Sequence, residues 1–226
     1  MLVQIGGHRL EPVTTIKQAE AIVGGFSKPS KMPGYCLSLS AEKCGTGSKL
    51  RAVKGSICEG CYAMKGRYVF PNTKKAHARR LAALSHPQWV EACVFAINKR
   101  APKNPEFRWH DSGDIQSLEH LEMIAEVATL TPSVKHWIPT KEYRIVAQFL
   151  RKHGAFPANL CVRISATKRG HKAPTCGGLP TSTVDSGLGW SCPVANGEQT
   201  CDNNSSGKAC RACWDSNVPN IDYHLH

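Results

Sequence analysis

The stretch EFRWHDSGDIQSLEHLEMIAEVATLTPSVKHWIPTKEYRIVAQFLRKHGAFPANLCVRIS, residues 106–165, decides the fold. It repeats a unit of roughly 25 residues in which a short apolar strand is followed by an amphipathic helix. Such units give parallel strands joined by right-handed crossovers. The sequence therefore predicts an α/β fold, either a partial (β/α) barrel or an open parallel sheet. The predicted strands are residues 106–110, 134–139 and 159–165, and the predicted helices between them are residues 117–130 and 141–154, the second ended by Gly154.

The regions on either side of this stretch lack its regular alternation of strands and helices. We expect a single domain, 1–226, in three parts: an N-terminal segment (1–71), a βα core (72–165) and a C-terminal extension (166–226). The N-terminal segment looks like an irregular, cysteine-rich loop apart from a helix over residues 15–23. The C-terminal extension looks like an irregular, cysteine-rich tail with few large apolar residues, so burial alone would not order it. Two further helices are predicted at the start of the βα core, over residues 72–84 and 87–100.

Composition narrows the class of protein. The 226 residues contain no apolar run near the roughly 20 residues that a membrane span needs. The N-terminus lacks the basic start and apolar region of a secretory signal. We therefore predict no membrane partner and a cytoplasmic location. The charge is lopsided, because residues 1–105 hold 17 Lys and Arg but 5 Asp and Glu, whereas residues 106–226 hold 12 of each kind. Such a basic half attracts nucleic acid or a phosphate-bearing ligand, although a basic surface without a partner is an alternative.

Eleven cysteines, an odd number without a secretory context, argue against a disulfide framework and favour metal binding. Cys93 falls on the apolar stripe of a helix and Cys161 inside a strand, so both are expected in the core. Each remaining set ends in a C-x2-C pair, whose thiolates can converge on one ion or cluster. The first predicted set is Cys36, Cys44, Cys58 and Cys61, and the second is Cys192, Cys201, Cys210 and Cys213.

Zinc and iron-sulfur clusters both accept four thiolates, so spacing alone does not separate them. We favour iron-sulfur, as 4Fe-4S, because zinc ribbons are usually small autonomous units whereas these cysteines accompany a βα core. Whether Cys36 is a ligand stays open. Three ligands would leave one iron of a four-iron cluster free for chemistry, and four would close the site. The alternative is a zinc-stabilised, non-catalytic protein that binds nucleic acid or belongs to a virion.

Polar residues follow the predicted strands, where ligands bind in α/β proteins. His110 could move a proton, Asp111 and Asp114 could accept from a ligand, and Lys141 could clamp an anion. The alternatives are a simple helix-entry turn at 110–114 and an ordinary first-turn lysine at 141. The predicted catalytic residues are His110, Asp111, Asp114 and Lys141. The predicted cofactor-binding residues are Ser112, Gly113, Thr140 and Arg163. Gly113 would let a ligand approach the backbone. Arg163 is expected to lie in a pocket or to pair with Asp111 or Asp114.

A basic segment, KGRYVFPNTKKAHARR at residues 65–80, interleaves aromatic and cationic side chains. Such a segment can bind phosphates and stack bases. The alternative is a solvated helix face with Tyr68 and Phe70 in the core.

Several blocks of the sequence together resemble a known family. The blocks are SKMPGYCLSLSAEKCGTGSKLRAVKGSICEGCYAMKGRYVFPN, FRWHDSGDI, HWIPTK, CPVANGEQTC and CRACWD, spread over residues 27–215. They resemble the gene product 88 domain of phages and prophages, which implies a viral origin and hence the host cytoplasm. Residues matching the family pattern are Cys44, Cys58, Cys61, Arg108, His110, Ser112, Gly113, Asp114, Thr140 and Lys141.

The predicted architecture also resembles, more distantly, a shortened radical S-adenosylmethionine (SAM) barrel with an auxiliary cluster. That resemblance implies SAM as a cofactor and a cluster-dependent reaction. The spacing differs, because those enzymes usually carry C-x3-C-x2-C and this chain carries C-x13-C-x2-C between Cys44 and Cys61.

Overall fold

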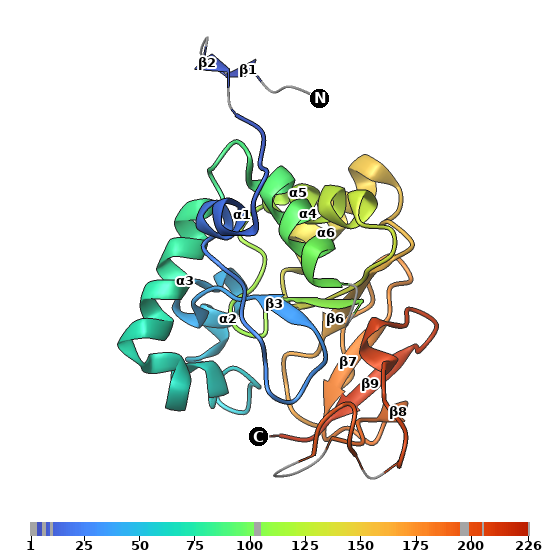
Figure 1. The fold of residues 1–226 in the computed structure, drawn as a ribbon. Coiled ribbons are helices and arrows are strands. Elements are labelled where there is room, and N and C mark those ends of the chain that lie inside the picture. The colour runs from blue at the N-terminus through green and yellow to red at the C-terminus, as the bar shows by residue number, and fades with distance from the viewer. Residues whose placement is uncertain are drawn as a thin grey trace.

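A parallel sheet forms the centre of the protein (Figure 1). The computed structural model describes residues 4–5, 8–9, 11–101, 105–194, 199–204 and 206–225. Seven strands pair in the order β3-β4-β5-β6-β7-β9-β8, and every pair is parallel. The strands are β3 (Tyr35–Leu37), β4 (Glu106–Trp109), β5 (Lys135–Thr140), β6 (Leu160–Ser165), β7 (Thr181–Val184), β8 (Trp190–Ser191) and β9 (Asn220–Tyr223). A separate antiparallel pair joins β1 (Gln4–Ile5) to β2 (His8–Arg9).

The helices begin and end close to where the sequence predicts. Thr15 caps the first helix through Gln18 N, and Ser117 caps the fifth through His120 N. Gly154, with φ of 82°, ends the sixth. The α-helices are α1 (Ile16–Val23), α2 (Gly45–Leu50), α3 (Pro71–Ala83), α4 (Trp89–Arg100), α5 (Leu118–Leu130) and α6 (Tyr143–His153). The short 3-10 helices are η1 (Ala41–Lys43), η2 (Tyr62–Met64), η3 (Gly66–Val69) and η5 (Ala212–Trp214).

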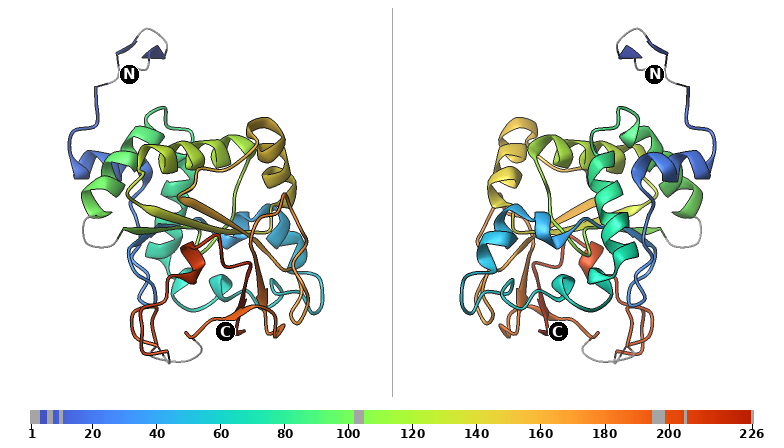
Figure 2. Two further views of the ribbon diagram at one scale, coloured as in Figure 1. Left: turned by 90° about the vertical axis from the view of Figure 1, so that its right-hand side faces the viewer. Right: turned by 90° about the vertical axis from the view of Figure 1, so that its left-hand side faces the viewer.

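One face of the sheet is covered by α4, α5 and α6 (Figure 2). Strands β3 to β7 follow one another in the sheet without reversing direction. Because a reversal is what sends helices to the second face, these crossover helices stay on one side, as in a barrel. The sheet is nevertheless open, so the predicted α/β class with an open parallel sheet is confirmed. Within the described part of the chain, no helix has the length and apolarity needed to cross a membrane.

The side-chain alternation of the strands separates two cores. Leu37, Trp109 and Ile138 point into the helix-covered core, together with Cys93, which is fully buried as predicted. Residues one position away face the other side, which we call the second face of the sheet. There the C-terminal extension forms a smaller apolar cluster of Trp137, Cys213, Trp214 and Ile221. The rings of Trp137 and Trp214 pack edge to face at 5.2 Å.

The expectation that both flanking parts are irregular is wrong in part. The N-terminal segment supplies the edge strand β3 and the helix α2, and the C-terminal extension supplies β7, β8 and β9. The two longer strands of the extension read TSTV and NIDY, without a run of apolar residues. Their polar side chains satisfy one another instead, because Thr183 Oγ1 donates to Asp222 Oδ1 at 2.8 Å. Backbone pairing and these side-chain bonds order strands that hydrophobicity does not reveal.

Candidate functional site

The loop that carries the first cysteines lies across the carboxyl ends of the central strands. This cysteine loop, residues 44–61, follows β3 and η1. Ile57 N donates to Thr167 O, just beyond β6, at 2.8 Å, and Ser56 pairs with Lys168 in an isolated bridge. Near β5, Glu142 accepts bonds from Thr46 N at 2.6 Å and from Thr46 Oγ1 at 2.8 Å. The loop is therefore fastened to the edge of the sheet where the predicted pocket residues lie.

Asp114 joins the ends of β4 and β5 at this edge. Its Oδ1 accepts from Thr140 Oγ1 at 2.6 Å and from Ile115 N at 2.8 Å, and its Oδ2 accepts from Lys141 N at 3.0 Å. Burial raises the pKa of the Asp114 carboxyl to about 6, although these three bonds act in the opposite direction and Glu142 adds to the rise. The structure thus brings together Asp114, Thr140 and Lys141, as the strand-end argument predicts.

Cys44, Cys58 and Cys61 lie beside this carboxyl. Burial raises the pKa of the Cys44 thiol to about 12, and Asp114, Cys61 and Cys58 raise it further through their negative charges. Burial also raises the pKa of Cys58, whereas the Lys141 ammonium lowers it. A Cβ built on Gly47 would lie 3.6 Å from Cys44 Sγ and 3.7 Å from Cys58 Sγ. The absence of a side chain at Gly47 leaves room beside both sulfurs.

Cys36 lies elsewhere, within β3 on the second face of the sheet. Its Sγ is 3.2 Å from Ser38 Oγ, and its charged neighbours are Asp111, Arg108 and Arg80. Burial raises the pKa of this thiol to about 12. The structure therefore separates Cys36 from the three cysteines of the cysteine loop and groups it with Asp111 instead.

The four cysteines of the second set are neighbours of one another. Burial raises the pKa of Cys201 to about 11, and the nearby Cys192 and Cys210 raise it further. Burial likewise raises the pKa of Cys213 to about 12, with Cys192 and Cys201 among its neighbours. The backbone holds the set together, because Cys210 N donates to Cys201 O at 2.7 Å. The two predicted sets are thus gathered by the fold, apart from Cys36.

All eleven cysteines are free thiols. As the side chains stand, no group of three or more His, Cys, Asp or Glu within the described residues could hold a metal ion. Within each set, the charge of neighbouring thiols raises the pKa of other members of that set. In neither set, however, do the described sulfurs lie close enough around a common point to bind one metal ion.

Three predicted pocket residues have other surroundings. His110, with φ of 62°, is buried against His120 at a ring distance of 5.3 Å, away from Asp114. Gly113, with φ of 84°, is required by the protein itself, since a Cβ there would lie 2.7 Å from Leu39 Cβ. The adjacent Ser112 is buried and its carbonyl accepts from Leu39 N at 2.9 Å. Leu39 fills the space that a Cβ at position 113 would take, so packing within the protein already accounts for the glycine.

Arg163 is fully buried and holds the C-terminal extension on the second face of the sheet. Its five N–H groups donate to five backbone carbonyls at 2.5–3.2 Å. A guanidinium with every donor used cannot also clamp a ligand. The prediction that Arg163 binds a cofactor or pairs with Asp111 or Asp114 is therefore wrong. The carbonyl acceptors belong to Thr181, Ala212, Cys213, Asp215 and Val218.

Four further side chains shape the site: Glu142, which the strand-end argument selects together with Thr140 and Lys141, and three tyrosines, which it does not select. Glu142 fastens the cysteine loop through Thr46, and Tyr143 Oη donates to Ser165 O at the end of β6. Tyr68 Oη donates to Asp111 Oδ2 at 3.0 Å, and Tyr62 Oη donates to the Asp111 carbonyl. Glu142 directly follows Lys141 at the carboxyl end of β5, which is why the strand-end argument selects it, whereas no local pattern marks the contacts of the tyrosines.

The basic segment 65–80 is mostly a solvated surface. Lys65, Arg67, Lys75 and Arg79 are exposed, and Phe70 is 56% exposed, so the expectation of a buried Phe70 is wrong. Arg80 is buried instead, where its Nε donates to Gly25 O at 2.7 Å and its Nη1 to Ser38 O at 3.3 Å.

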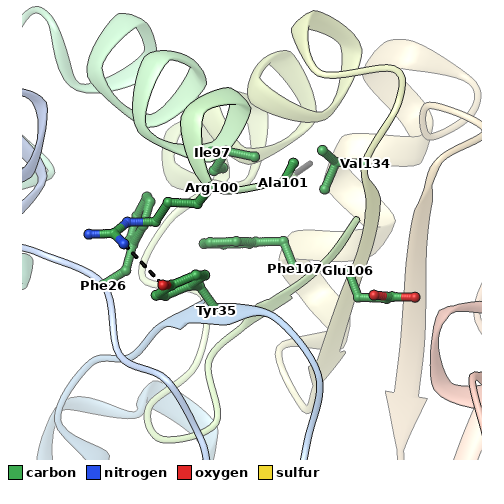
Figure 3. Close-up of a pocket in the computed structure, with 8 residues that line it drawn as sticks. All are labelled: Phe26, Tyr35, Ile97, Arg100, Ala101, Glu106, Phe107 and Val134. Carbon is green, nitrogen blue, oxygen red and sulfur yellow. Dashed lines mark hydrogen bonds between the residues drawn. The ribbon is translucent and has the colours of Figure 1, made fainter. Parts of the chain in front are cut away.

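A small pocket lies at the opposite end of the strands (Figure 3). Its volume is about 10 Å³, room for roughly one water molecule. Within it Arg100 stacks on Tyr35 at 4.6 Å and donates to its hydroxyl at 3.0 Å. This pocket is too small for a substrate.

The comparisons identify the family. A model of gene product 88, a family of phage gene products, matches residues 7–182. No curated protein and no solved structure matches the chain. The matched residues include the cysteine loop, Asp114, Thr140 and Lys141. The chain therefore belongs to the gene product 88 family.

Proposed function

We propose that this phage-family protein holds a cysteine-ligated inorganic centre at the carboxyl ends of its sheet, with Cys44, Cys58 and Cys61 as ligands. The observation that carries the proposal is the position of these three thiols, beside one another and beside Asp114. Free thiols of this number in one chain, gathered without disulfides, are typical of metal binding. The second set, Cys192, Cys201, Cys210 and Cys213, would hold a closed, structural centre.

The residues present suit such a centre in chemistry. Thiolates are the ligands that zinc and iron-sulfur clusters prefer, and Gly47 keeps the space between Cys44 and Cys58 free of a side chain. Because the sulfurs do not converge as they stand, the proposal requires the cysteine side chains to rotate inward when the centre binds. We favour 4Fe-4S over zinc at the first set, since three cysteines beside a strand-end site match an open centre better than a closed one.

A four-iron cluster with one open iron would supply an electron to a bound substrate or to SAM. The residues around it would position that ligand. Lys141 carries the positive charge nearest Cys58, and Thr140 and the Lys141 amide hold Asp114 in place. On this reading the reaction is cluster-dependent and the site residues are Asp114 and Lys141.

Metal and sulfide analysis of anaerobically purified protein tests the proposal. We expect bound iron with acid-labile sulfide and a brown colour. Changing Cys58 and Cys61 to Ser should remove the metal of the first set, and changing Cys210 and Cys213 should remove that of the second. Cys176→Ser is the matched control, because this thiol belongs to neither set. Colourless protein with stoichiometric zinc would replace iron-sulfur by the zinc alternative, and protein that takes up neither metal would refute the proposal. Addition of SAM to the reduced iron protein should change its EPR signal, and an unchanged signal would exclude SAM as the ligand.

A second candidate is nucleic-acid binding by the basic surface. Residues 43–80 hold ten Lys and Arg and one acidic residue, Glu59. The exposed aromatic side chains Tyr62 and Phe70 lie among them and could stack on bases. Of the cations, Lys74 pairs with Glu42 at 3.3 Å, which leaves Lys75 and Arg79 as better probes.

Charge reversal at Lys75 and Arg79 should weaken binding of single-stranded nucleic acid and flatten its dependence on salt. A matched control reverses two exposed cations outside this segment, Lys135 at the start of β5 and Arg151 in α6, neither of which forms an ion pair within the described residues. Equal weakening by both pairs would show that net charge, and not this surface, governs binding.

A further inference from the structure

Two guanidinium groups share one carboxylate on the second face of the sheet. Arg108, in β4, has Asp111, Tyr62 and Cys36 as its electrostatic neighbours. Arg80, from α3, has Cys36 and Asp111 as its neighbours. Asp111 forms no ion pair within 4.0 Å with either arginine, since the described ion pairs include neither contact. This cluster thus holds two positive charges against one negative charge.

The two arginines differ in how far their donors are used. Arg80 is 4% exposed and bonds to the carbonyls of Gly25 and Ser38. The Arg108 guanidinium stacks over the Trp137 ring at 4.4 Å, and its Nη1 contacts a poor acceptor, Met32 Sδ, at 3.1 Å. It also hydrogen-bonds to the Tyr62 side chain. Its Nε is buried without a hydrogen-bond partner within the described residues, as is Trp137 Nε1. Such unsatisfied buried donors are costly and need an explanation.

The Asp111 carboxylate does not pair with the Arg108 guanidinium, because its two oxygens already accept hydrogen bonds from other side chains. Its Oδ1 accepts from Ser38 Oγ and its Oδ2 from Tyr68 Oη. Tyr223, whose hydroxyl is 3.1 Å from Cys213 Sγ, is another electrostatic neighbour of Arg108. Arg108 is therefore a neighbour both of Tyr62, the residue after Cys61, and of Tyr223, which contacts the second cysteine set. Arg108 and Asp111 are both half-buried.

We propose that Arg108 is the anchor of a binding site for an oxyanion, the phosphate or carboxylate group of a small ligand held between the two cysteine sets. An oxyanion would supply the missing negative charge and accept from the guanidinium, while Trp137 keeps the guanidinium plane in position. Tyr62 and Asp111 would recognise donors elsewhere on the ligand. This site is separate from the metal proposal, because none of its contacts depends on a bound metal.

Titration calorimetry on the protein as purified tests the site, with inorganic phosphate and succinate as probes at constant ionic strength. We expect saturable binding of at least one probe, and the probe that binds identifies the oxyanion as phosphate or carboxylate. Arg108→Gln should weaken binding about 10- to 100-fold, since the lost bonds involve a charged donor. Arg79→Gln, an equal charge change on the exposed side of α3, should leave it unchanged.

A second variant separates binding from folding. Asp111→Asn removes the competing negative charge and should tighten binding several-fold. Equal affinity in wild type, Arg108→Gln and Asp111→Asn, or no saturation with either probe, would overturn the site. If Arg108→Gln fails to fold, Asp111→Asn alone decides, because unchanged or weaker binding there contradicts the proposal. Metal content measured on the same samples distinguishes the outcomes, since this proposal expects Arg108→Gln to keep the metal of the wild type.

Discussion

Replacing Arg163 with methionine should release the C-terminal extension from the sheet. Methionine has a similar length and no donor, so the change removes five hydrogen bonds while keeping most of the packing volume. Three of the freed carbonyls, those of Ala212, Cys213 and Asp215, lie on or beside η5. The substitution therefore removes the hydrogen bonds that join β6 to the segment carrying the second cysteine set.

The magnitude follows from two opposing effects. A hydrogen bond from a charged donor contributes about 1.5–3 kcal/mol, so five of them set an upper limit near 15 kcal/mol. Removing a buried charge also removes a desolvation penalty of several kcal/mol. The extension can lift away, so that water satisfies some of the carbonyls. We expect a net loss of about 3–5 kcal/mol, a large part of the 5–15 kcal/mol that stabilises a typical domain.

Urea unfolding and limited proteolysis measure this loss. The variant should unfold at lower urea and be cleaved faster within residues 206–225 than the wild type. Arg169→Met is the matched control, because Arg169 forms an ion pair with Asp185 at 2.7 Å while 59% exposed, and such pairs contribute about 1 kcal/mol or less. A stability of Arg163→Met within about 1 kcal/mol of wild type, with unchanged cleavage, would refute the anchoring role.

Three further predictions concern the carboxyl ends of the strands. Gly113→Ala should lower stability in thermal unfolding more than Gly154→Ala does. Both glycines have φ near 80°, but only a Cβ at position 113 would collide with another residue, at 2.7 Å from Leu39 Cβ. Equal losses of about 1 kcal/mol in the two variants would show that backbone strain alone matters. In metal-free protein, the folded-state pKa of Asp114 of about 6 exceeds its usual 3.8, so the unfolding free energy should fall by about 3 kcal/mol as pH rises from about 3 to 7. Asp114→Asn should abolish that fall, and an unchanged pH profile would contradict the assignment. Glu142→Ala removes the acceptor of the Thr46 amide and hydroxyl, which should loosen the cysteine loop. Alkylation of Cys44, measured relative to that of Cys176, should then be about tenfold faster than in the wild type. The same relative rate in variant and wild type would contradict the role of Glu142 in fastening the loop.

The central strands could be predicted because the face that they turn toward the helices is buried and apolar. Residues 106–110, 134–139 and 159–165 carry apolar side chains toward the helices, and this pattern is visible in the sequence. Strands β7 and β9 could not be predicted, because Thr183 and Asp222 bond to one another across the pair and leave no apolar pattern.

The same reasoning explains the site. Asp114, Thr140 and Lys141 meet because parallel strands place their carboxyl ends at one edge, which follows from topology alone. The surroundings of Arg163 and Gly113 depend on segments distant in sequence, the C-terminal extension and Leu39, whose paths no local pattern indicates. His110 differs as well, because it has a positive φ and packs against His120 of α5.

The strand order also has a consequence for synthesis on the ribosome. Strands β3 to β7 can pair in the order in which they emerge, but β9 lies between β7 and β8. Strand β8 is therefore synthesised about thirty residues before β9, the strand with which it pairs. The hydrogen bond from Cys192 N to the Asp222 carbonyl cannot form until β9 has been made. The second cysteine set can assemble only after residues 220–223 have left the exit tunnel, so until then the nascent chain presents thiols that are open to oxidation or to the wrong metal.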